Sequence, residues 1–312
     1  MKFSFLMSVY NEQKLIGSAL TNLLEMLRKS KVAYEILIGV DGTDGTEKIA
    51  REFASKNKHI TVFKFKERLG RTKTMNFLIE KAKGEILVNH DADRFLSVDP
   101  REIEKMFKDK RVGAIVSTDV GNRDTINEGQ RIFEDAYNDI KLNKYLVGNE
   151  APTPLFFSYI FRKSALGKKP YFITTQDDFE VTDKLLKRGY KILYSKKVAK
   201  HLADNPNMDR LTPRMIMMRR SRAEMFRGQA PKVLGMTVFR FSARIGEFLQ
   251  AIALAASRET PREFAEMIYY LFVVFVAVIM ARARLLLSKP DSNKLGGWKY
   301  STRAQDKVAV VK

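Results

Sequence analysis

The chain has 312 residues, of which 45% are hydrophobic, enough for one large domain with a sizeable core and an appendage. It has no cysteine, which excludes disulfide bonds, thiolate zinc sites and cysteine nucleophiles and fits a reducing compartment. Its 56 basic and 36 acidic residues give a net charge of +20, which points to a polyanionic partner: nucleic acid, anionic lipid headgroups or a phosphorylated substrate.

Residues 3–118 predict alternating strands and helices. Short apolar runs are expected to be strands at 3–9, 34–40, 61–66, 85–89 and 112–118. Runs with helical periodicity lie between them, at 13–30, 46–56, 71–83 and 100–108. The run at 3–9 is too short for a signal peptide. This alternation predicts an α/β fold with a mostly parallel, Rossmann-like sheet flanked by helices, which binds ligands at the carboxyl ends of its strands.

The next part of the chain is less regular. We expect a helix at 128–143, a strand at 155–161, a helix at 177–188 and a strand at 191–195. Residues 1–200 are therefore expected to form one domain. Residues 201–235, rich in Arg, Met and Pro, are expected to be a connecting region.

The region 236–290 differs in kind, because two apolar helices are expected there. Residues 236–257 have apolar side chains at three- and four-residue spacing, which predicts an amphipathic helix. Residues 267–281 are 15 uninterrupted apolar positions, about 22 Å long as a helix and short of the ~30 Å hydrocarbon core of a bilayer. A helix continued to 287 would span that core, but it would bury Arg282 and Arg284 unless they snorkel.

Three arrangements of this second helix are open. It lies in or dips into one leaflet, it crosses the bilayer, or it packs in a homo-oligomer. The basic tail at 291–312 favours an anionic membrane surface as partner, at the cytoplasmic face of the cell membrane. Nucleic acid is not expected as a partner, because the chain has neither zinc-finger spacing nor the aromatic strand motif of RNA-binding sheets.

Four segments carry the residues suited to chemistry, three just after predicted strands and one opening a predicted helix. They are Val9-Tyr10-Asn11-Glu12, Val40-Asp41-Gly42-Thr43-Asp44-Gly45-Thr46, Asp91-Ala92-Asp93 and Gln176-Asp177-Asp178-Phe179-Glu180. Asp91 and Asp93 stand two residues apart just past a buried strand. Their carboxylates can therefore converge on one divalent cation, which can in turn hold a diphosphate.

In these segments the chain resembles the family-2 glycosyltransferases, which have the nucleotide-sugar-binding GT-A fold. The usual motifs of that family are a V-Y-N-E first turn, a D-D-G-S-T-D-G-T second turn, a D-x-D metal motif and an E-D pair before a helix. The resemblance covers residues 3–200. The second turn is one residue shorter here, with Val40 where an aspartate often stands.

The resemblance implies a binding site for a nucleotide-sugar donor. Tyr10 offers a flat face to the base, Asp41 would read a uracil imide, and Glu12 lies nearby. In similar enzymes an arginine of the 68–71 region approaches the nucleotide. The positions expected to bind the donor are Tyr10, Glu12, Asp41, Arg71, Asp91, Arg220 and Arg222.

Other roles are open for several of these residues. Asn11 and Glu12 are also suited to starting a helix, and for Asp44 and the glycines of the second turn we expect a turn-forming role. Arg220 and Arg222 are similar to the Q-x-x-R-W element of processive members, or they belong to a solvated helix face. The Gln and Trp of that element are absent, which speaks against processive polymer synthesis.

A Mn²⁺ or Mg²⁺ ion is the expected cofactor. The resemblance implies Asp93 as a direct ligand, and Asp91 as a contact to the ribose or a ligand through water. His201 is expected to be a third ligand or a solvated loop histidine. The ion would neutralise the diphosphate and so stabilise the departing nucleotide.

The resemblance selects Asp178 as the general base, with Asp177 where the family has Glu. An alternative is that Thr174 or Thr175 caps the helix and the two acids merely favour its first turn. The two roles are compatible, because a carboxylate fixed at a helix N-terminus can deprotonate an acceptor hydroxyl.

The sequence therefore predicts a metal-dependent inverting glycosyltransferase that moves a sugar from a nucleotide donor, UDP-linked, to a lipid-linked or lipid-phosphate acceptor. A nucleotidyltransferase on a similar sheet is disfavoured, because no Gly-rich loop with a lysine follows the first strand. The alternative from another class is a basic, membrane-attached nucleic-acid-binding or scaffold protein. That alternative explains the charge but leaves the four motifs to coincidence.

Overall fold

The computed structural model forms two compact units. It describes residues 2–92, 94–96, 98–117, 128–148, 150–151, 158–168, 171, 177–195, 199–201, 241–287 and 310–311. The first unit comprises Met1–Val120, Leu146–Leu202 and Gly297–Lys312, and the second comprises Gly121–Tyr145 and Ala203–Gly296.

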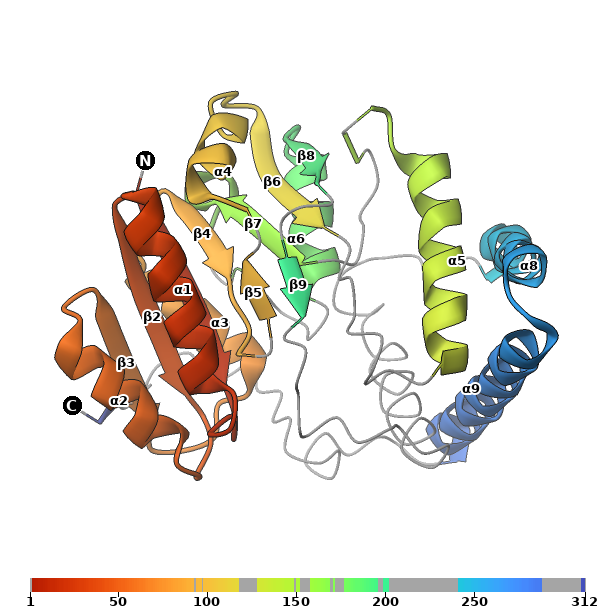
Figure 1. The fold of residues 1–312 in the computed structure, drawn as a ribbon, viewed down its shortest axis with the longest axis horizontal. Helices are drawn as coiled ribbons and strands as arrows, with labels where there is room; N and C mark the ends of the chain where they lie inside the picture. The colour runs from red at the N-terminus through yellow and green to blue at the C-terminus, as the bar shows by residue number, and fades with distance from the viewer. Residues whose placement is uncertain are drawn as a thin grey trace. The chain divides into compact units, whose positions relative to one another are not determined.

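The first unit is built on an eight-stranded sheet with the strand order β10-β3-β2-β1-β4-β7-β6-β8 (Figure 1). Its strands are β1 (Phe3–Val9), β2 (Tyr34–Val40), β3 (Ile60–Phe65), β4 (Ile86–Asn89), β6 (Val112–Ser117), β7 (Ser158–Arg162), β8 (Lys191–Tyr194) and β10 (Val310–Val311). Strand β1 pairs in parallel with β2 and β4, β2 with β3, and β6 with β8. Strand β7 is antiparallel to β4 and β6, and β10 is antiparallel to β3. The predicted fold class, a mostly parallel sheet flanked by helices, is confirmed.

Helices cover both faces of this sheet. They are α1 (Ile16–Ser30), α2 (Thr46–Lys56), α3 (Arg71–Lys81), α4 (Pro100–Met106) and α6 (Asp177–Lys187), with a 3₁₀ turn, η1 (Lys163–Ala165). Phe3, Phe5 and Met7 share one buried cluster with α1, as expected for alternate residues of a strand. On the other face, a Cβ on Gly39 would lie 2.5 Å from the Cγ2 of Thr74 in α3. The position of Gly39 thus lets α3 approach the sheet closely.

The register of the parallel strands fixes where a site can form. Val9 pairs with Val40, and Leu6 pairs with Asn89. Strands β1, β2 and β4 therefore end at one edge of the sheet, where the first three motifs follow them. A small antiparallel sheet pairs β5 (Arg94–Leu96), which follows the third motif, with β9 (Ala199–His201).

In the described residues, the second unit is a packing of three helices: α5 (Glu128–Tyr145), α8 (Phe241–Arg258) and α9 (Pro261–Leu287). Its buried core consists of Ile132, Ala136, Ala251, Ala255 and Met267. The expected helices at 128–143 and 236–257 are thus present, the second one starting at Phe241 within the described residues. Helix α5 lies inside the range expected for the sheet domain, yet it packs with the C-terminal helices. The boundary at residue 200 remains a prediction.

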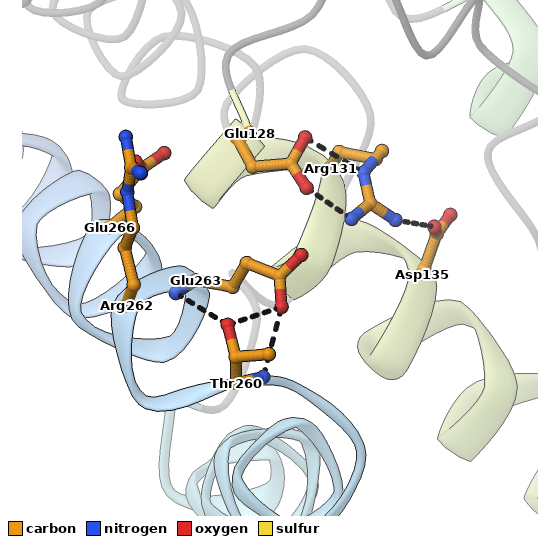
Figure 2. A network of polar contacts seen from close by, with 7 residues as sticks. All are labelled: Glu128, Arg131, Asp135, Thr260, Arg262, Glu263 and Glu266. Carbon is orange, nitrogen blue, oxygen red and sulfur yellow. Dashed lines mark hydrogen bonds and ion pairs between the residues drawn. The ribbon is translucent and has the colours of Figure 1, made fainter.

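Helix α9 begins six residues before the apolar run, because Thr260 and Glu263 form a capping box. Glu263 accepts hydrogen bonds from the amide and the hydroxyl of Thr260, at 2.9 and 2.6 Å, as Figure 2 shows. In the same view Arg131 of α5 is held by Glu128 and Asp135. Among the helices within the described ranges, none combines the length and hydropathy needed to cross a lipid bilayer.

Most of the connecting region at 201–235 and most of the tail at 291–312 lie outside the described residues.

Candidate functional site

The first two motifs interlock where β1 and β2 end. The side-chain oxygen of Asn11, a residue with a φ of 57°, accepts a hydrogen bond from the Thr43 amide at 2.9 Å. The Gln13 side-chain oxygen accepts one from the Gly45 amide at 3.0 Å. A Cβ on Gly42 would lie 2.4 Å from the Asn11 oxygen, so this close approach requires glycine. These contacts use residues 11–13 and explain why α1 starts at Ile16 and not at 13 as expected.

Asp44 completes the link between the two turns. Its carboxylate accepts hydrogen bonds from the Thr46 amide and hydroxyl, at 3.0 and 2.5 Å, and from the Gln13 amide at 3.2 Å. Partial burial raises the pKa of Asp44, but the hydrogen bonds from Thr46 and Gln13 outweigh it, so that the pKa lies below its ordinary value. Asp44 acts as a turn residue, as expected.

Asp41 holds the loop that connects β3 to α3. Asp41 as a whole residue is 9% exposed, and its two carboxylate oxygens accept hydrogen bonds from the amides of Leu69 at 2.7 Å and Gly70 at 2.6 Å. Gly70 precedes α3 with a φ of 78°, a conformation that favours glycine. This role of Asp41 was not predicted from the sequence. Each carboxylate oxygen can accept a second hydrogen bond, so the contact is compatible with reading a base.

Tyr10 is exposed at the same edge, with 45% of its surface accessible. The guanidinium carbon of Arg68 lies 3.8 Å from the centre of the Tyr10 ring. Arg68 belongs to the loop that Asp41 holds. The expected flat face of Tyr10 is therefore present, and a cation from the β3–α3 loop is stacked on it.

Arg71 and Asp91 are also brought together, as the first residue of α3 and the second residue after β4. A nitrogen of the Arg71 guanidinium lies 2.7 Å from an oxygen of Asp91, and both side chains are partly buried. The hydrogen bond from the His90 amide to the Leu6 carbonyl, 3.0 Å long, keeps the chain after β4 beside β1. Two residues expected to bind the donor thus contact each other.

The metal-binding side chains are the least described part of the site. Asp93 and the side chain of His201 lie outside the described residues. In the backbone register, His201 stands opposite Arg94, the residue that follows Asp93. No group of three side chains able to hold a metal ion is found within the part of the chain that the structure describes.

The fourth motif opens a helix, as expected, since Asp177 and Asp178 are the first residues of α6. Their side chains, like Arg220 and Arg222 as a whole, are not among the described parts of the chain. The roles predicted for these four residues stay predictions.

Comparison with known proteins identifies the family to which this chain belongs. Residues 4–169 match the family "Glycosyl transferase family 2". This match covers more than half of the chain, which therefore belongs to that family, and the predicted resemblance is confirmed.

Individual relatives are more distant. The chain is 30% identical over 199 residues to poly-beta-1,6-N-acetyl-D-glucosamine synthase of Staphylococcus aureus, an alignment covering 61% of this chain and 47% of that protein. It is 30% identical over 113 residues to glycosyltransferase AglD of Haloferax volcanii, covering 35% and 18% of the two chains. The chain thus spans about half the length of the curated synthases it matches.

A solved structure matches nearly the whole chain in fold. It is the mannosyltransferase PcManGT from Pyrobaculum calidifontis in complex with GDP-Man and Mn²⁺. The TM-score is 0.59 at 19% identity, and the alignment covers 92% of this chain and 88% of that one. The architecture is that of the GT-A glycosyltransferases.

Proposed function

We propose that this chain is a metal-dependent inverting glycosyltransferase that transfers a sugar from a UDP-linked donor to a lipid-linked acceptor at a membrane surface. The observation that carries the proposal is the convergence of Tyr10, Asp41, Arg71 and Asp91 at one edge of the sheet. Tyr10, Asp41 and Asp91 follow three different strands, and Arg71 opens α3. The β3–α3 loop and the start of α3 contact all three: Asp41 binds the loop, Arg68 stacks on Tyr10, and Arg71 pairs with Asp91.

The donor would lie along this edge. Tyr10 offers a ring on which a base can stack, and Asp41 and Glu12 offer acceptors for base or ribose hydrogens. Arg71, Arg220 and Arg222 would pair with the diphosphate, since a guanidinium matches phosphate oxygens with two parallel hydrogen bonds.

Asp91, Asp93 and His201 would hold a Mn²⁺ or Mg²⁺ ion. The two carboxylates fit such an ion, because carboxylate oxygens suit Mg²⁺ and Mn²⁺. The β5–β9 pairing brings the backbone of His201 beside that of Arg94, the residue after Asp93. When bound, the ion would neutralise the diphosphate charge that develops as the nucleotide leaves. The Arg71 contact would keep the Asp91 carboxylate in place beside that charge.

The transfer itself would be a single displacement. Asp178, with Asp177 beside it at the start of α6, takes the proton of an acceptor hydroxyl. The acceptor oxygen forms a bond to the anomeric carbon, while the bond from that carbon to the diphosphate oxygen breaks and its electron pair leaves with the nucleotide. A phosphate acceptor is already anionic and needs no base.

This difference supplies the test of the base. Asp178→Asn should abolish transfer to a hydroxyl acceptor and only weaken transfer to a lipid phosphate, measured as sugar incorporation into each. Full activity of the variant with a hydroxyl acceptor would overturn the assignment of Asp178.

The membrane part of the proposal is supported by an apolar face of α9. This face consists of Ile268, Tyr269, Phe272, Phe275, Ile279 and Met280, which recur at helical spacing and are all exposed. The opposite face, with Met267, Tyr270 and Val273, packs in the three-helix unit. No acidic residue occurs between 267 and 290, while Arg282, Arg284 and Lys289 follow the apolar run. An apolar helix face flanked by basic residues is typical of binding to an anionic lipid surface, here at the cytoplasmic face of the membrane.

Sedimentation with lipid vesicles tests this membrane surface. Phe272 and Phe275 are each 62% exposed. Since burial of one Phe side chain is worth about 1.5–3 kcal/mol, changing both to Gln should weaken partitioning to anionic vesicles at least about tenfold. The matched control is Val147→Gln, an exposed apolar residue of the first unit. Equal sedimentation of both variants would contradict a lipid-binding role of α9, and a concentration-dependent oligomer lost in the double variant would indicate a second copy as the partner.

A further inference from the structure

The strands of the large sheet define a second edge, opposite to the one that carries the motifs. Strands β1, β2, β3 and β4 are parallel, and β7 is antiparallel to both β4 and β6, so β6 and β8 run in the same direction as β1. The connections that lead into these strands therefore meet at one edge, which we call the amino edge. It consists of residues 2, 31–33, 57–59, 82–85, 107–111 and 188–190, together with 163 directly after β7.

Every strand from β3 to β8 in the sheet has a basic residue at the amino edge. In the spatial order of the strands, they are Lys58, Lys31, Lys2, Lys83, Lys163, Lys110 with Arg111, and Arg188. Backbone hydrogen bonds tie the edge together, as the amide of Lys163 donates to the carbonyl of Glu85 at 2.9 Å. Because neighbouring strands lie about 4.8 Å apart, this amino-edge row extends over about 30 Å.

Little negative charge offsets the amino-edge row. The acidic residues of the edge are Glu85 and Asp109, and Asp109 is paired with Arg111 at 2.8 Å. Glu35 of β2 lies 3.7 Å from Lys2. The exposed lysines of the row that form no ion pair within the described residues are Lys31, Lys58, Lys83 and Lys110. The amino edge is thus a strip of positive charge that an anionic partner can neutralise.

We propose that the amino-edge row is an electrostatic contact of the first unit with the anionic headgroups of a lipid bilayer. A bilayer surface offers phosphates to the whole row at once, and lysine attracts them as a point charge that needs no fixed geometry. Single-stranded nucleic acid fits less well, because it binds by stacking its bases on aromatic rings. None of the large hydrophobic residues exposed in the described part of the chain lies at this edge.

The choice of a lipid partner rests on the proposed membrane attachment through α9. The binding of an apolar helix face to a membrane strengthens when basic residues attract anionic lipids. The apolar face of α9 belongs to the second unit and the amino-edge row to the first, so each unit has a membrane contact of its own.

Contact through the amino edge has a consequence for the acceptor. Strands β1 and β2 have seven residues each, so the amino edge and the donor site at the other edge are about 23 Å apart. A sugar carried at the end of a lipid-linked oligosaccharide can reach that far from the headgroups, whereas a bare lipid phosphate cannot. The oligosaccharide should therefore be the better acceptor, and a preference for the bare lipid phosphate would contradict this orientation.

Sedimentation of the full chain with vesicles of phosphatidylglycerol and phosphatidylcholine tests the contact. The row variant combines Lys58→Gln, Lys83→Gln and Lys110→Gln, which change exposed side chains only. Each lysine near an anionic surface is worth about fivefold in partitioning, so this variant should bind about a hundredfold more weakly. Vesicles of phosphatidylcholine alone should bind the variant and the wild type equally.

The matched control combines Lys14→Gln, Lys48→Gln and Lys66→Gln, which remove the same charge from exposed positions near the other edge. It should partition like wild type in about 0.1 M salt, because charges more than about 10 Å from the lipid are screened. Equal weakening in the two triple variants, or none in the row variant, would overturn the inference. Binding to soluble polyphosphate but not to the anionic vesicles would overturn the lipid assignment.

Titration with UDP keeps the proposed function separate from this test. The row variant changes no residue of the donor site, so it should bind UDP as the wild type does. Wild-type protein that binds the vesicles through the row but binds no nucleoside diphosphate would overturn the proposed function and leave the lipid contact standing. Loss of UDP binding in the row variant alone would show that the substitutions disturb the fold, and single substitutions of the same lysines would then replace it in the sedimentation test.

Discussion

Gly129, the second residue of α5, should tolerate no side chain, because α9 passes directly against it. A Cβ at this position would lie 2.2 Å from the Glu266 carbonyl oxygen and 2.9 Å from the Cα of Met267. Both are backbone atoms, so the strain is relieved only if one of the two helices shifts. Overpacking of this kind costs about 1–3 kcal/mol. The better helix propensity of alanine offsets at most about 1 kcal/mol of it. Gly129→Ala is therefore expected to destabilise the three-helix unit by about 1–2 kcal/mol.

The matched control lies in the same unit. Gly246 is a helical glycine of α8, and within the described residues no neighbouring heavy atom lies within 4 Å of where a Cβ would lie. Gly246→Ala should therefore stabilise by about 0.5–1 kcal/mol. Hydrogen exchange of the α5 and α9 amides measures both effects. Exchange from the three-helix unit should be about five- to thirtyfold faster in Gly129→Ala and slower in Gly246→Ala. Shifts of the same sign in the two variants would refute the close approach of α9 to Gly129.

Three further predictions concern the turns and caps. If the main role of Asp41 is to hold the β3–α3 loop, Asp41→Asn should weaken the binding of UDP, GDP, CDP and dTDP by similar factors in nucleotide titrations. A changed order of preference among the four would instead show that Asp41 recognises the base. Because its pKa is lowered on folding, Asp44 stabilises the protein fully above about pH 4, the unfolded value, and loses this contribution as pH falls through its folded pKa. Urea unfolding at pH 3–5 (about one unit on either side of that value) should accordingly show a smaller acid-induced loss in Asp44→Asn than in wild type, and equal losses would contradict the role. Thr260→Ala should destabilise the start of α9 by about 1 kcal/mol, seen as faster amide exchange in its first turn, and unchanged exchange there would exclude the capping box.

The sequence predicted most elements of the sheet unit, because their patterns are local. Strands β1 and β2 are mostly apolar runs followed by turn residues, and α1 has its buried side chains on one helical face. The features that depend on tertiary contacts could not be predicted from the sequence. Helix α1 starts late because Gln13 is bound to the second turn. Strands β5, β9 and β10 have two or three residues each, so their partners define them and not their own pattern.

The same division applies to the site. Parallel strands end at one edge of a sheet, so the meeting of Tyr10, Asp41 and Asp91 could be predicted from their positions after strands. The loop contacts of Asp41 and the stack of Arg68 on Tyr10 could not be predicted. Both depend on the path of the β3–α3 loop, which ends at Gly70, a residue with positive φ. The packing of α5 with α8 and α9 could not be predicted either, since an amphipathic pattern does not show which element the apolar face contacts.

Calorimetric titration of the full chain with UDP, GDP, CDP and dTDP, each with and without Mn²⁺, tests the central claim most directly. Asp93→Asn serves as the matched variant, because it removes one charge from the expected metal ligands and keeps the side-chain shape. We expect that UDP binds, that binding depends on Mn²⁺, and that the variant loses this dependence. Indifference to all four diphosphates, or binding that Mn²⁺ and Asp93→Asn leave unchanged, would contradict a metal-dependent glycosyltransferase and favour the basic scaffold protein.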